Sequence, residues 1–588
     1  MSKNLVIVES PAKAKTIEKF LGPDYVVKSS IGHIRDMPKK DMGVDIENNF
    51  QPTYAISADK KKVVADLKKS VKIATKIFLA TDEDREGEAI AWHLQQALSL
   101  AEDTPRIVFH EITKGAITDA INNPRTIDTD LVNAQQARRI IDRLVGFEIS
   151  PVLWRKISGA RSAGRVQSPV VRIVVERERE ISAHSSSSSH KVKANLANSS
   201  NELLEVKLSL DFKSKDEALS FAENVLLAEL KVNSVETKPS KRSPKAPFIT
   251  STLQQEASQK LGFSVKQTMS IAQNLYREGA ITYMRTDSLN LSETAITAAQ
   301  EVIVSKFGSE FHQARRYKTN SSGAQEAHEA IRPTDLTKPS ILGLDDQSTK
   351  LYSLIYKRTL ASQMSDAQLQ KTKININISN RSEHFIADGE VLSFAGFLEV
   401  YDYMAAEDKL LPEVSKGDLL TLVDLASKES FSRAKPRFTE ASLVKEIEQM
   451  GIGRPSTFAT MITTVQDRNY VVKETREGVQ RDYQLIEIED GVISESIQTE
   501  TTGAEKNKLF PTNVAYLLVD FLVKNFSNII GYEFTANLES DFDLIAEESK
   551  PWAGVIRDFY EPFHAQIELA KDISRDETHG KRDLGEDP

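Results

Sequence analysis

Two residues with complementary chemistry stand close together in the middle of the chain, the tyrosine Tyr283 and the arginine Arg285. The run Ala280 to Tyr283 predicts a strand, and residues two apart on a strand face the same side. The guanidinium would then hold an anion, such as a phosphate, that the tyrosine attacks. A tyrosine has an ordinary pKa of about 10, so a positive charge beside it favours its use as a nucleophile. Because most Tyr-x-Arg pairs are only structural, this pair needs support from other residues.

Carboxylates follow two other predicted strands. The acidic run Asp82 to Glu88 comes directly after the apolar run Ile77 to Ala80, and Glu9 ends the run Leu5 to Val8. The carboxyl ends of parallel strands meet at one edge of a sheet and form a ligand-binding crevice there. Carboxylates brought together repel each other unless a cation neutralises them, and oxygen ligands suit magnesium. An Asp-x-Asp pair alone is more often the start of a helix, but its place after a buried strand favours a metal site for phosphoryl chemistry.

Residue types and motifs that the sequence lacks limit the cofactors it could use. The chain has no cysteine, which excludes disulfides and cysteine-based zinc sites within it. We find no Gly-x-x-x-x-Gly-Lys-Ser/Thr phosphate loop in the sequence. We therefore expect Mg²⁺ as the cofactor, with no ATP and no zinc in this chain.

The charge is distributed unevenly. The net charge is −9, yet Arg138 to Arg179 holds ten Lys or Arg against four Asp or Glu, while the residues after Leu538 are rich in acids. Local basic patches govern phosphate binding more than the total charge does. A salt-bridged helix surface is the alternative explanation of the basic stretch.

Membrane insertion and secretion find no support in the sequence. The apolar run Val514 to Val523 is interrupted by Asp520 and is too short for a membrane span. The opening apolar run ends at Glu9 and lacks the layout of a signal peptide. We expect a cytoplasmic, nucleoid-associated protein with no membrane partner.

The elements that must position these residues fall into several units, as a length of 588 residues requires. The first 120 residues alternate strands and helices, as in an α/β domain with a largely parallel sheet. Residues 123–182 are helical and basic, and the serine run Ser185 to Ser189 marks a loop or linker. Residues 190–240 and 370–430 favour strands.

Two segments share one layout and form a weak internal repeat. Thr252 to Tyr283 and Ala441 to Val472 each read as helix, glycine turn, helix and strand, with the glycine turns at Gly262 and Gly451. This is the winged-helix pattern, which is common on DNA but also occurs in proteins that never bind it.

With these motifs in place, the chain resembles the bacterial type IA DNA topoisomerase I family. Val8 to Thr16 and Asp82 to Glu88 are similar to the two halves of the family's metal-binding Toprim domain, and Ile281 to Ser288 to its active-site segment. Further similar motifs are Ser162 to Ser168, Ala327 to Pro333 and Gly451 to Thr457.

The resemblance implies a multidomain α/β and α+β toroid. An N-terminal Toprim α/β domain would span 1–122, and a strand-rich arch 183–243 plus 370–438. A winged-helix-like DNA-binding domain would combine 123–182 with 439–588, and a movable domain, 244–369, would carry Tyr283. The resemblance also implies an ATP-independent isomerase that cuts one DNA strand through a 5′-phosphotyrosyl link, passes a strand and reseals, relaxing negatively supercoiled DNA as a monomer.

Site residues follow from the resemblance position by position. Lys13 matches a residue that assists the leaving 3′-oxygen, and His328 matches one beside the scissile phosphate. The implied catalytic residues are Tyr283, Arg285, Glu9, Lys13 and His328, and the implied metal ligands are Glu9, Asp82, Asp84 and Glu86. The implied DNA contacts are His33, Arg138, Arg139, Asp142, Trp154, Ser162, Ala163, Gly164, Arg165, Val166, Gln167, Arg285, Arg454, Thr457 and Arg468.

The chain departs from the family pattern at two places, and other functions remain open. Arg161 stands where the family usually has an apolar residue, and Ser182 to Ser189 replaces an aromatic and proline stretch. His33 as an ordinary loop histidine and Trp154 as a core residue are alternatives. The rival functions are the decatenating topoisomerase III branch, a Toprim nuclease or primase that would not use Tyr283, and a non-enzymatic winged-helix protein.

Overall fold

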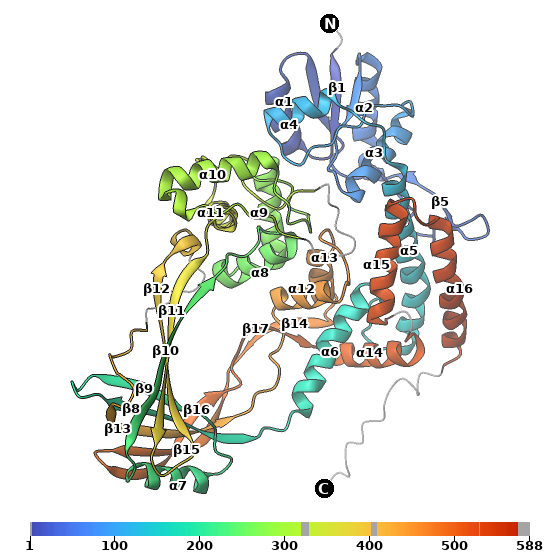
Figure 1. The fold of residues 1–588 in the computed structure, drawn as a ribbon. Coiled ribbons are helices and arrows are strands. Elements are labelled where there is room, and N and C mark those ends of the chain that lie inside the picture. Colours follow the sequence, from blue (N-terminus) through green and yellow to red (C-terminus); the bar gives the residue numbers. More distant parts are fainter. Residues whose placement is uncertain (1–2, 319–327, 402–408, 528–529, 574–588) are drawn as a thin grey trace.

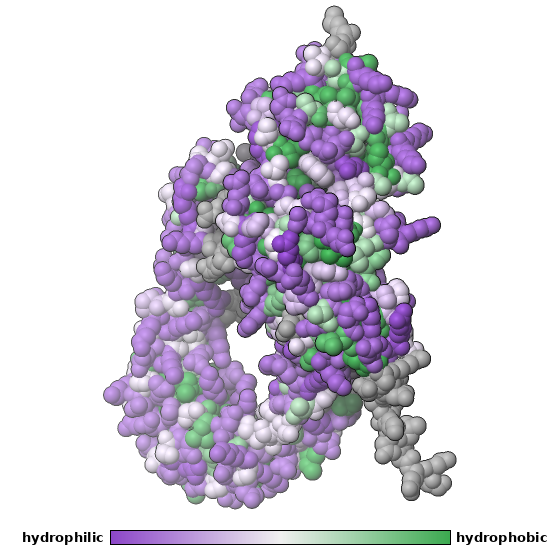
Figure 2. Space-filling view, turned by 90° about the vertical axis from the view of Figure 1, so that its right-hand side faces the viewer, coloured by the Kyte–Doolittle hydropathy of each residue, from purple (hydrophilic) through white to green (hydrophobic). Residues whose placement is uncertain are grey.

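A computed structural model describes residues 3–318, 328–401, 409–527 and 530–573 of the chain. The elements form a ring: an α/β unit sits above a helical column on one side, and a helical cluster and a long sheet complete the other side (Figure 1). The space-filling view shows an opening through the lower part of the molecule (Figure 2). The predicted toroid and its mixed helix and strand content are thus confirmed. Ala327, the first residue of one predicted motif, lies outside the described residues.

The N-terminal α/β unit is built on a parallel sheet with the order β2-β1-β7. The run Leu5–Val8 is almost fully buried, which explains why this central strand is continuously apolar. The strands are β1 (Asn4–Val8), β2 (Tyr25–Ser29) and β7 (Ile77–Leu79), and the helices are α1 (Pro11–Leu21), α2 (Lys61–Ile73), α3 (Arg85–Leu98) and α4 (Lys114–Asn122). Two short ladders, β3 (Arg35–Asp36) with β6 (Ala55–Ile56) and β4 (Val44–Asp45) with β5 (Gln51–Pro52), extend toward the helical column.

The helical column joins segments that are far apart in the sequence into one hydrophobic core. The long helix α5 (Thr129–Lys156) runs through it and packs against α15 (Tyr532–Ala546) and α16 (Trp552–Lys571). Its other elements are α6 (Gln167–Ala183), α12 (Glu440–Gln449), α13 (Phe458–Asp467), β14 (Val471–Arg476), β17 (Glu505–Pro511) and α14 (Asn513–Asn525).

The helical cluster opposite carries Tyr283 and shares a core with the N-terminal unit. It contains α8 (Thr250–Leu261), α9 (Val265–Arg277), α10 (Glu293–Phe307) and α11 (Asp346–Ser362). The strand predicted for Ala280 to Tyr283 is wrong: only Ile281 forms a bridge, to Pro333. The Tyr283 amide donates instead to the carbonyl of His110 in the N-terminal unit, at 2.9 Å, so this backbone serves an interface between units rather than a sheet.

The remaining side of the ring is an eight-stranded sheet with the order β10-β11-β12-β9-β8-β13-β15-β16. Its strands are β8 (Ser188–Ala197), β9 (Leu203–Leu208), β10 (Leu230–Arg242), β11 (Ala367–Ile378), β12 (His384–Phe394), β13 (Leu419–Phe431), β15 (Val479–Glu489) and β16 (Val492–Thr502), and α7 (Lys215–Val225) covers one face. Ser188 and Ser189 of the predicted serine linker begin β8. The hairpin β15–β16, within the predicted range 439–588, belongs to this sheet because Ile486 and Ile488 bury into its core.

Both helix pairs of the predicted repeat are present. The helices α8 and α9 and the helices α12 and α13 form where the repeat predicts them, and α12 contacts α8. Only the second pair is followed by its predicted strand, β14. Within the described ranges, no helix is both long enough and apolar enough to cross a bilayer.

Candidate active site and nucleic-acid groove

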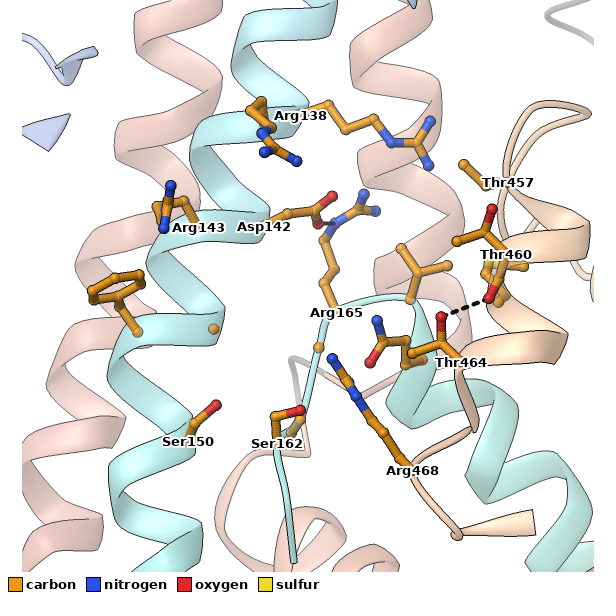
Figure 3. A pocket seen from close by; sticks show the side chains of 18 of the residues that line it. Arg138, Asp142, Arg143, Ser150, Ser162, Arg165, Thr457, Thr460, Thr464 and Arg468 are labelled. Atoms are coloured by element: carbon orange, nitrogen blue, oxygen red, sulfur yellow. Dashed lines mark hydrogen bonds and ion pairs between the residues drawn. The ribbon is translucent and has the colours of Figure 1, made fainter. Parts of the chain in front are cut away.

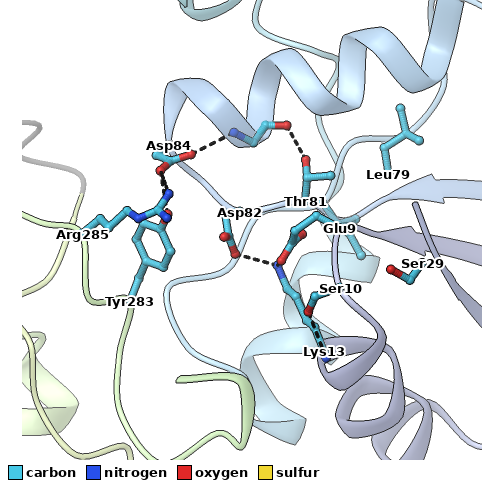
Figure 4. A network of polar contacts seen from close by, with 12 residues as sticks. Glu9, Ser10, Lys13, Ser29, Leu79, Thr81, Asp82, Asp84, Tyr283 and Arg285 are labelled. Carbon is cyan, nitrogen blue, oxygen red and sulfur yellow. Dashed lines mark hydrogen bonds and ion pairs between the residues drawn. The ribbon is translucent and has the colours of Figure 1, made fainter. Parts of the chain in front are cut away.

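The carboxyl ends of β1 and β7 bring Glu9 and Asp82 together around one buried lysine. Lys13, in the first turn of α1, is fully buried, and its Nζ lies 3.0 Å from Asp82 and 3.3 Å from Glu9 (Figure 4). Burial acts to lower the pKa of Lys13, but the two carboxylates outweigh it and raise the pKa. Burial also raises the pKa of Glu9 to about 7, with Lys13 opposing and Asp82 adding to the effect. This confirms the predicted convergence of the two strand ends.

The next acid, Asp84, has a structural and a chemical role at once. One carboxylate oxygen caps α3 by accepting from the Gly87 amide at 2.8 Å. The loop is tight at Gly87, because a Cβ there would lie 2.1 Å from the Asp82 carbonyl oxygen. Glycine at this position therefore lets three acids follow β7 within one short turn.

The other oxygen of Asp84 receives both members of the Tyr-x-Arg pair. The Tyr283 hydroxyl donates to Oδ2 at 2.6 Å, and Arg285 lies 3.3 Å from the same oxygen (Figure 4). Tyr283 is only 2% exposed. Burial first, and then Asp84 and Asp82, raise its pKa well above 10, against the opposing effect of Arg285. In this closed arrangement the tyrosine is protonated and shielded, although the arginine lies where the sequence predicts.

Glu86 lies on the open side of the same group. His33 Nε2 contacts its carboxylate at 2.5 Å, and Gln135 donates to the other oxygen at 3.2 Å. Burial would raise the pKa of Glu86, but His33, Gln135 and Arg139 together outweigh it and the pKa falls to about 2. His33 thus lies against the acidic group, and its role as a DNA contact stays a prediction.

All four predicted metal ligands line one cleft of about 440 Å³, together with Arg285. Oxygen donors of this kind suit magnesium. Each carboxylate now faces a side chain of the protein, Lys13, Arg285 or His33. No cluster of three or more His, Asp or Glu in the described ranges is already arranged as a metal-ligand set. The donor set fits the ion chemically, and binding would require these side chains to share or give up their contacts.

A groove of about 660 Å³ lies along α5 in the helical column (Figure 3). One wall is α5, another is the loop before α6, and α13 closes the third side. Of the predicted DNA contacts, those that line it are Arg138, Arg139, Asp142, Ser162, Ala163, Gly164, Arg165, Val166, Gln167, Thr457 and Arg468. The structure thus brings together residues from three separate motifs in one basic groove.

Two carboxylates of α15, which sequence reasoning missed, hold arginines in and beside the groove. Glu539 is fully buried and lies 2.8 Å from Arg165 and 3.1 Å from Arg138. One turn later, Asp543 lies 2.5 Å from Arg454 and 2.6 Å from Arg85. The signal in the sequence is their spacing of four residues, which places both acids on one face of the helix.

A third cavity connects the groove with the candidate catalytic cleft that the four carboxylates line. It measures about 470 Å³ and shares Arg138, Arg139 and Asp142 with the groove. It shares Asp84, Glu86 and Arg285 with the cleft. His328 and Arg454 also line it. The three cavities form one track that passes the Tyr283–Asp84 contact.

Trp154 lies apart from this track. It is not among the residues lining the groove, and its side chain is 61% exposed, so it is not a core residue. Its indole nitrogen donates to the carbonyl of Arg161. Arg161, the departure from the family pattern, donates through its guanidinium to the Asp467 carbonyl at 3.2 Å.

Comparison with known proteins agrees with this geometry. A model of a DNA topoisomerase family matches residues 126–484, and a Toprim domain model matches residues 4–112. The chain belongs to the bacterial DNA topoisomerase I family. The predicted enzyme class, an isomerase that changes DNA topology, is thereby confirmed.

Individual relatives match most of the chain. It is 43% identical to DNA topoisomerase 1 of Campylobacter jejuni, covering 97% of this chain and 80% of the relative. It is 41% identical to DNA topoisomerase 1 of Escherichia coli, covering 97% and 67%. The match to DNA topoisomerase 1 of Streptomyces coelicolor covers 95% of this chain but 61% of the relative, at 43% identity. The full-length topoisomerase I structure from Thermotoga maritima superposes with a TM-score of 0.83 at 37% identity, covering 97% of this chain and 91% of that one.

Proposed function

We propose that this family member relaxes negatively supercoiled DNA without ATP, by cutting one strand through Tyr283, passing a strand and resealing. The observation that carries the proposal is the place of Tyr283 and Arg285. Both meet Asp84 at one end of an arginine-lined track.

The cleavage chemistry follows from the contacts of Tyr283. When a phosphodiester enters beside Arg285, the phenolic oxygen attacks phosphorus and its proton passes to Asp84, its acceptor at 2.6 Å. The 3′-oxygen leaves and takes a proton from Lys13, which gives a 5′-phosphotyrosyl link and a free 3′-hydroxyl. Arg285, with His328 and Glu9, binds or orients the scissile phosphate. Resealing reverses these steps, and because the phosphotyrosyl bond retains the energy of the broken one, no nucleotide is needed.

Glu9, Asp82, Asp84 and Glu86 would hold Mg²⁺ in the cleft that they line. The bound ion supplies positive charge that stabilises phosphoryl oxygens and aligns the broken ends for resealing. Lys13 already supplies one positive charge between Glu9 and Asp82, so cleavage depends on the ion less than resealing does.

The remaining residues bind the strand. Groove arginines contact phosphates, the glycine in Ser162-Ala163-Gly164 lets the backbone approach, and exposed Trp154 stacks on a base at the margin. We also propose that the protein acts as a cytoplasmic, nucleoid-associated monomer. The four domains expected from the sequence would be the units that move relative to one another, with 244–369 as the movable domain that carries Tyr283. His33, Thr457 and Arg468 complete the proposed DNA contacts.

Removing the nucleophilic oxygen tests the proposal most simply. Tyr283→Phe should abolish both the covalent adduct and plasmid relaxation, because only one hydroxyl is lost and the buried ring still packs against Tyr276. The measurement is the amount of labelled single-stranded DNA that migrates with the protein on a gel after the protein is denatured with detergent. Tyr276→Phe is the matched control and should keep the adduct. Adduct formed by Tyr283→Phe would place the nucleophile elsewhere.

The carboxylates are tested through their demand for magnesium. Asp82→Asn combined with Asp84→Asn should raise the magnesium concentration needed for relaxation and weaken magnesium binding in calorimetry, because the cleft loses two charges. Resealing should be impaired more than cleavage. Asp41→Asn with Asp45→Asn in the same domain is the control. A double variant with unchanged magnesium dependence in both assays would refute the ligand assignment.

Substrate choice tests the single-strand requirement. Opening a duplex costs roughly 1–2 kcal/mol per base-pair step, and negative supercoiling supplies this energy whereas positive supercoiling opposes it. We expect relaxation of negatively supercoiled plasmid with magnesium alone and little of positively supercoiled plasmid, unless the latter carries a single-stranded bubble. Equal relaxation of both intact plasmids would contradict the requirement.

A further inference from the structure

The loop after β2 holds an isoleucine in an unfavourable backbone conformation. Ile31 has φ of +56°, in the left-handed region that β-branched residues rarely adopt. Among the residues that the structure describes, it is the one β-branched residue with a positive φ. Its side chain is 50% exposed, so burial does not compensate for the strain.

Four hydrogen bonds fix this conformation. The Ile31 amide donates to Ser29 Oγ at 3.0 Å, and Lys60 Nζ donates to the Ile31 carbonyl at 2.7 Å. The Ser30 amide donates to the Val8 carbonyl at 2.9 Å and the Gly32 amide to the Glu9 carbonyl at 2.7 Å. The loop is therefore tied to the end of β1, where Glu9 stands, and Ile31 keeps a fixed position relative to the catalytic carboxylates.

Ile31 lines the catalytic cleft together with Glu9, Asp84 and Arg285. The cleft adjoins the cavity that leads to the arginine groove, and the two share Asp84, Glu86 and Arg285. A strand laid along the track from the groove would thus reach Ile31 after passing Arg285. Charged and polar side chains dominate this part of the track, whereas Ile31 offers an exposed apolar surface that cannot bind a phosphate.

We propose that Ile31 packs against one nucleobase of the bound strand, beyond the scissile phosphate as seen from the arginine groove, and so fixes which phosphodiester faces Tyr283. This rests on the proposed function of the site. Aliphatic side chains pack on and between bases in other nucleic-acid complexes, and each base has an apolar face that such contacts use without reading its edge. The strained backbone is the structural cost of holding the side chain at that place.

The competing explanation is that the loop exists only to aim His33 at Glu86. His33 follows two residues later and contacts that carboxylate. In that case the Ile31 side chain would be dispensable, and removing it would leave base-dependent steps unchanged. The two explanations differ in whether the effect of residue 31 depends on a base in the DNA.

The test combines variants at residue 31 with single abasic sites in the DNA. Ile31→Ala removes most of the side chain and keeps the strained backbone, whereas Ile31→Gly also relieves the strain. Ile73→Ala, at an isoleucine of α2 that is also exposed (73%) and lies outside the cleft, is the control. A set of single-stranded oligonucleotides carries one abasic site at each position around the main cleavage site. For each combination of protein and oligonucleotide, the yield of covalent adduct is measured, and binding is measured by fluorescence anisotropy.

For the native chain and Ile73→Ala, we expect an abasic site at one position beyond the scissile phosphate to weaken cleavage and binding about fivefold to tenfold, as for loss of one base contact. In Ile31→Ala and Ile31→Gly, an abasic site at that one position should have no effect. These variants should cleave and bind intact DNA as weakly as the native chain cleaves and binds the abasic DNA. Ile31→Gly should also resist urea better than the native chain. Identical abasic profiles in all four proteins would overturn the proposal. If the native chain forms no adduct, the proposed function fails, while the anisotropy profile still decides the role of Ile31.

Discussion

The carboxylate of Asp84 joins the two halves of the catalytic site, and the rest of the arrangement depends on it. One oxygen caps α3 and the other accepts from Tyr283 at 2.6 Å. Asp84 belongs to the N-terminal unit and Tyr283 to the helical cluster across the ring, so a single side chain connects chemistry to closure of the ring. Burial and two neighbouring acids raise the pKa of Tyr283, which keeps the proposed nucleophile protonated in this closed arrangement. In the proposed mechanism, strand entry loosens this contact, which joins the two units together with their shared core and the Tyr283–His110 backbone hydrogen bond.

Along the track, positive side chains are paired with carboxylates of the protein. The protein carries a net charge of −9, and yet its groove is lined with arginines. Two of them, Arg138 and Arg165, are held by Glu539 of α15. The pKa of this buried carboxyl is lowered to about 2, because Arg138, Arg165 and Arg454 together outweigh the effect of burial. Paired in this way, the guanidiniums are fixed in position before DNA binds, and phosphates can join or replace the carboxylates without leaving an isolated buried charge.

The sequence predicted those parts of the site that local pattern determines. Strand ends followed by acids place Glu9 and Asp82 at one edge, because a buried parallel strand is recognisable from its apolar run alone. The strand around Tyr283 was predicted wrongly, since its amide pairs with His110 across an interface that no local pattern reports. The place of the hairpin β15–β16 is hidden from local pattern as well. Only the tertiary fold shows that Ile486 and Ile488 bury into the core of the eight-stranded sheet. The partners Glu539 and Asp543 are hundreds of residues from Arg165 and Arg85 in sequence, so only the tertiary fold reveals their pairing.

The central claim, that the Asp84 contact controls closure, can be measured in the chain itself by single-molecule energy transfer. The chain has no cysteine, so dyes can be placed through Ile73→Cys in the N-terminal unit and Leu342→Cys in the helical cluster, both highly exposed. Asparagine at residue 84 can still cap α3 but brings no charge to Arg285. Without DNA, Asp84→Asn should increase the open population relative to the native residue, whereas Asp66→Asn on the exposed face of α2 should not. An open population that stays the same in Asp84→Asn would contradict the claim that this contact holds the ring closed.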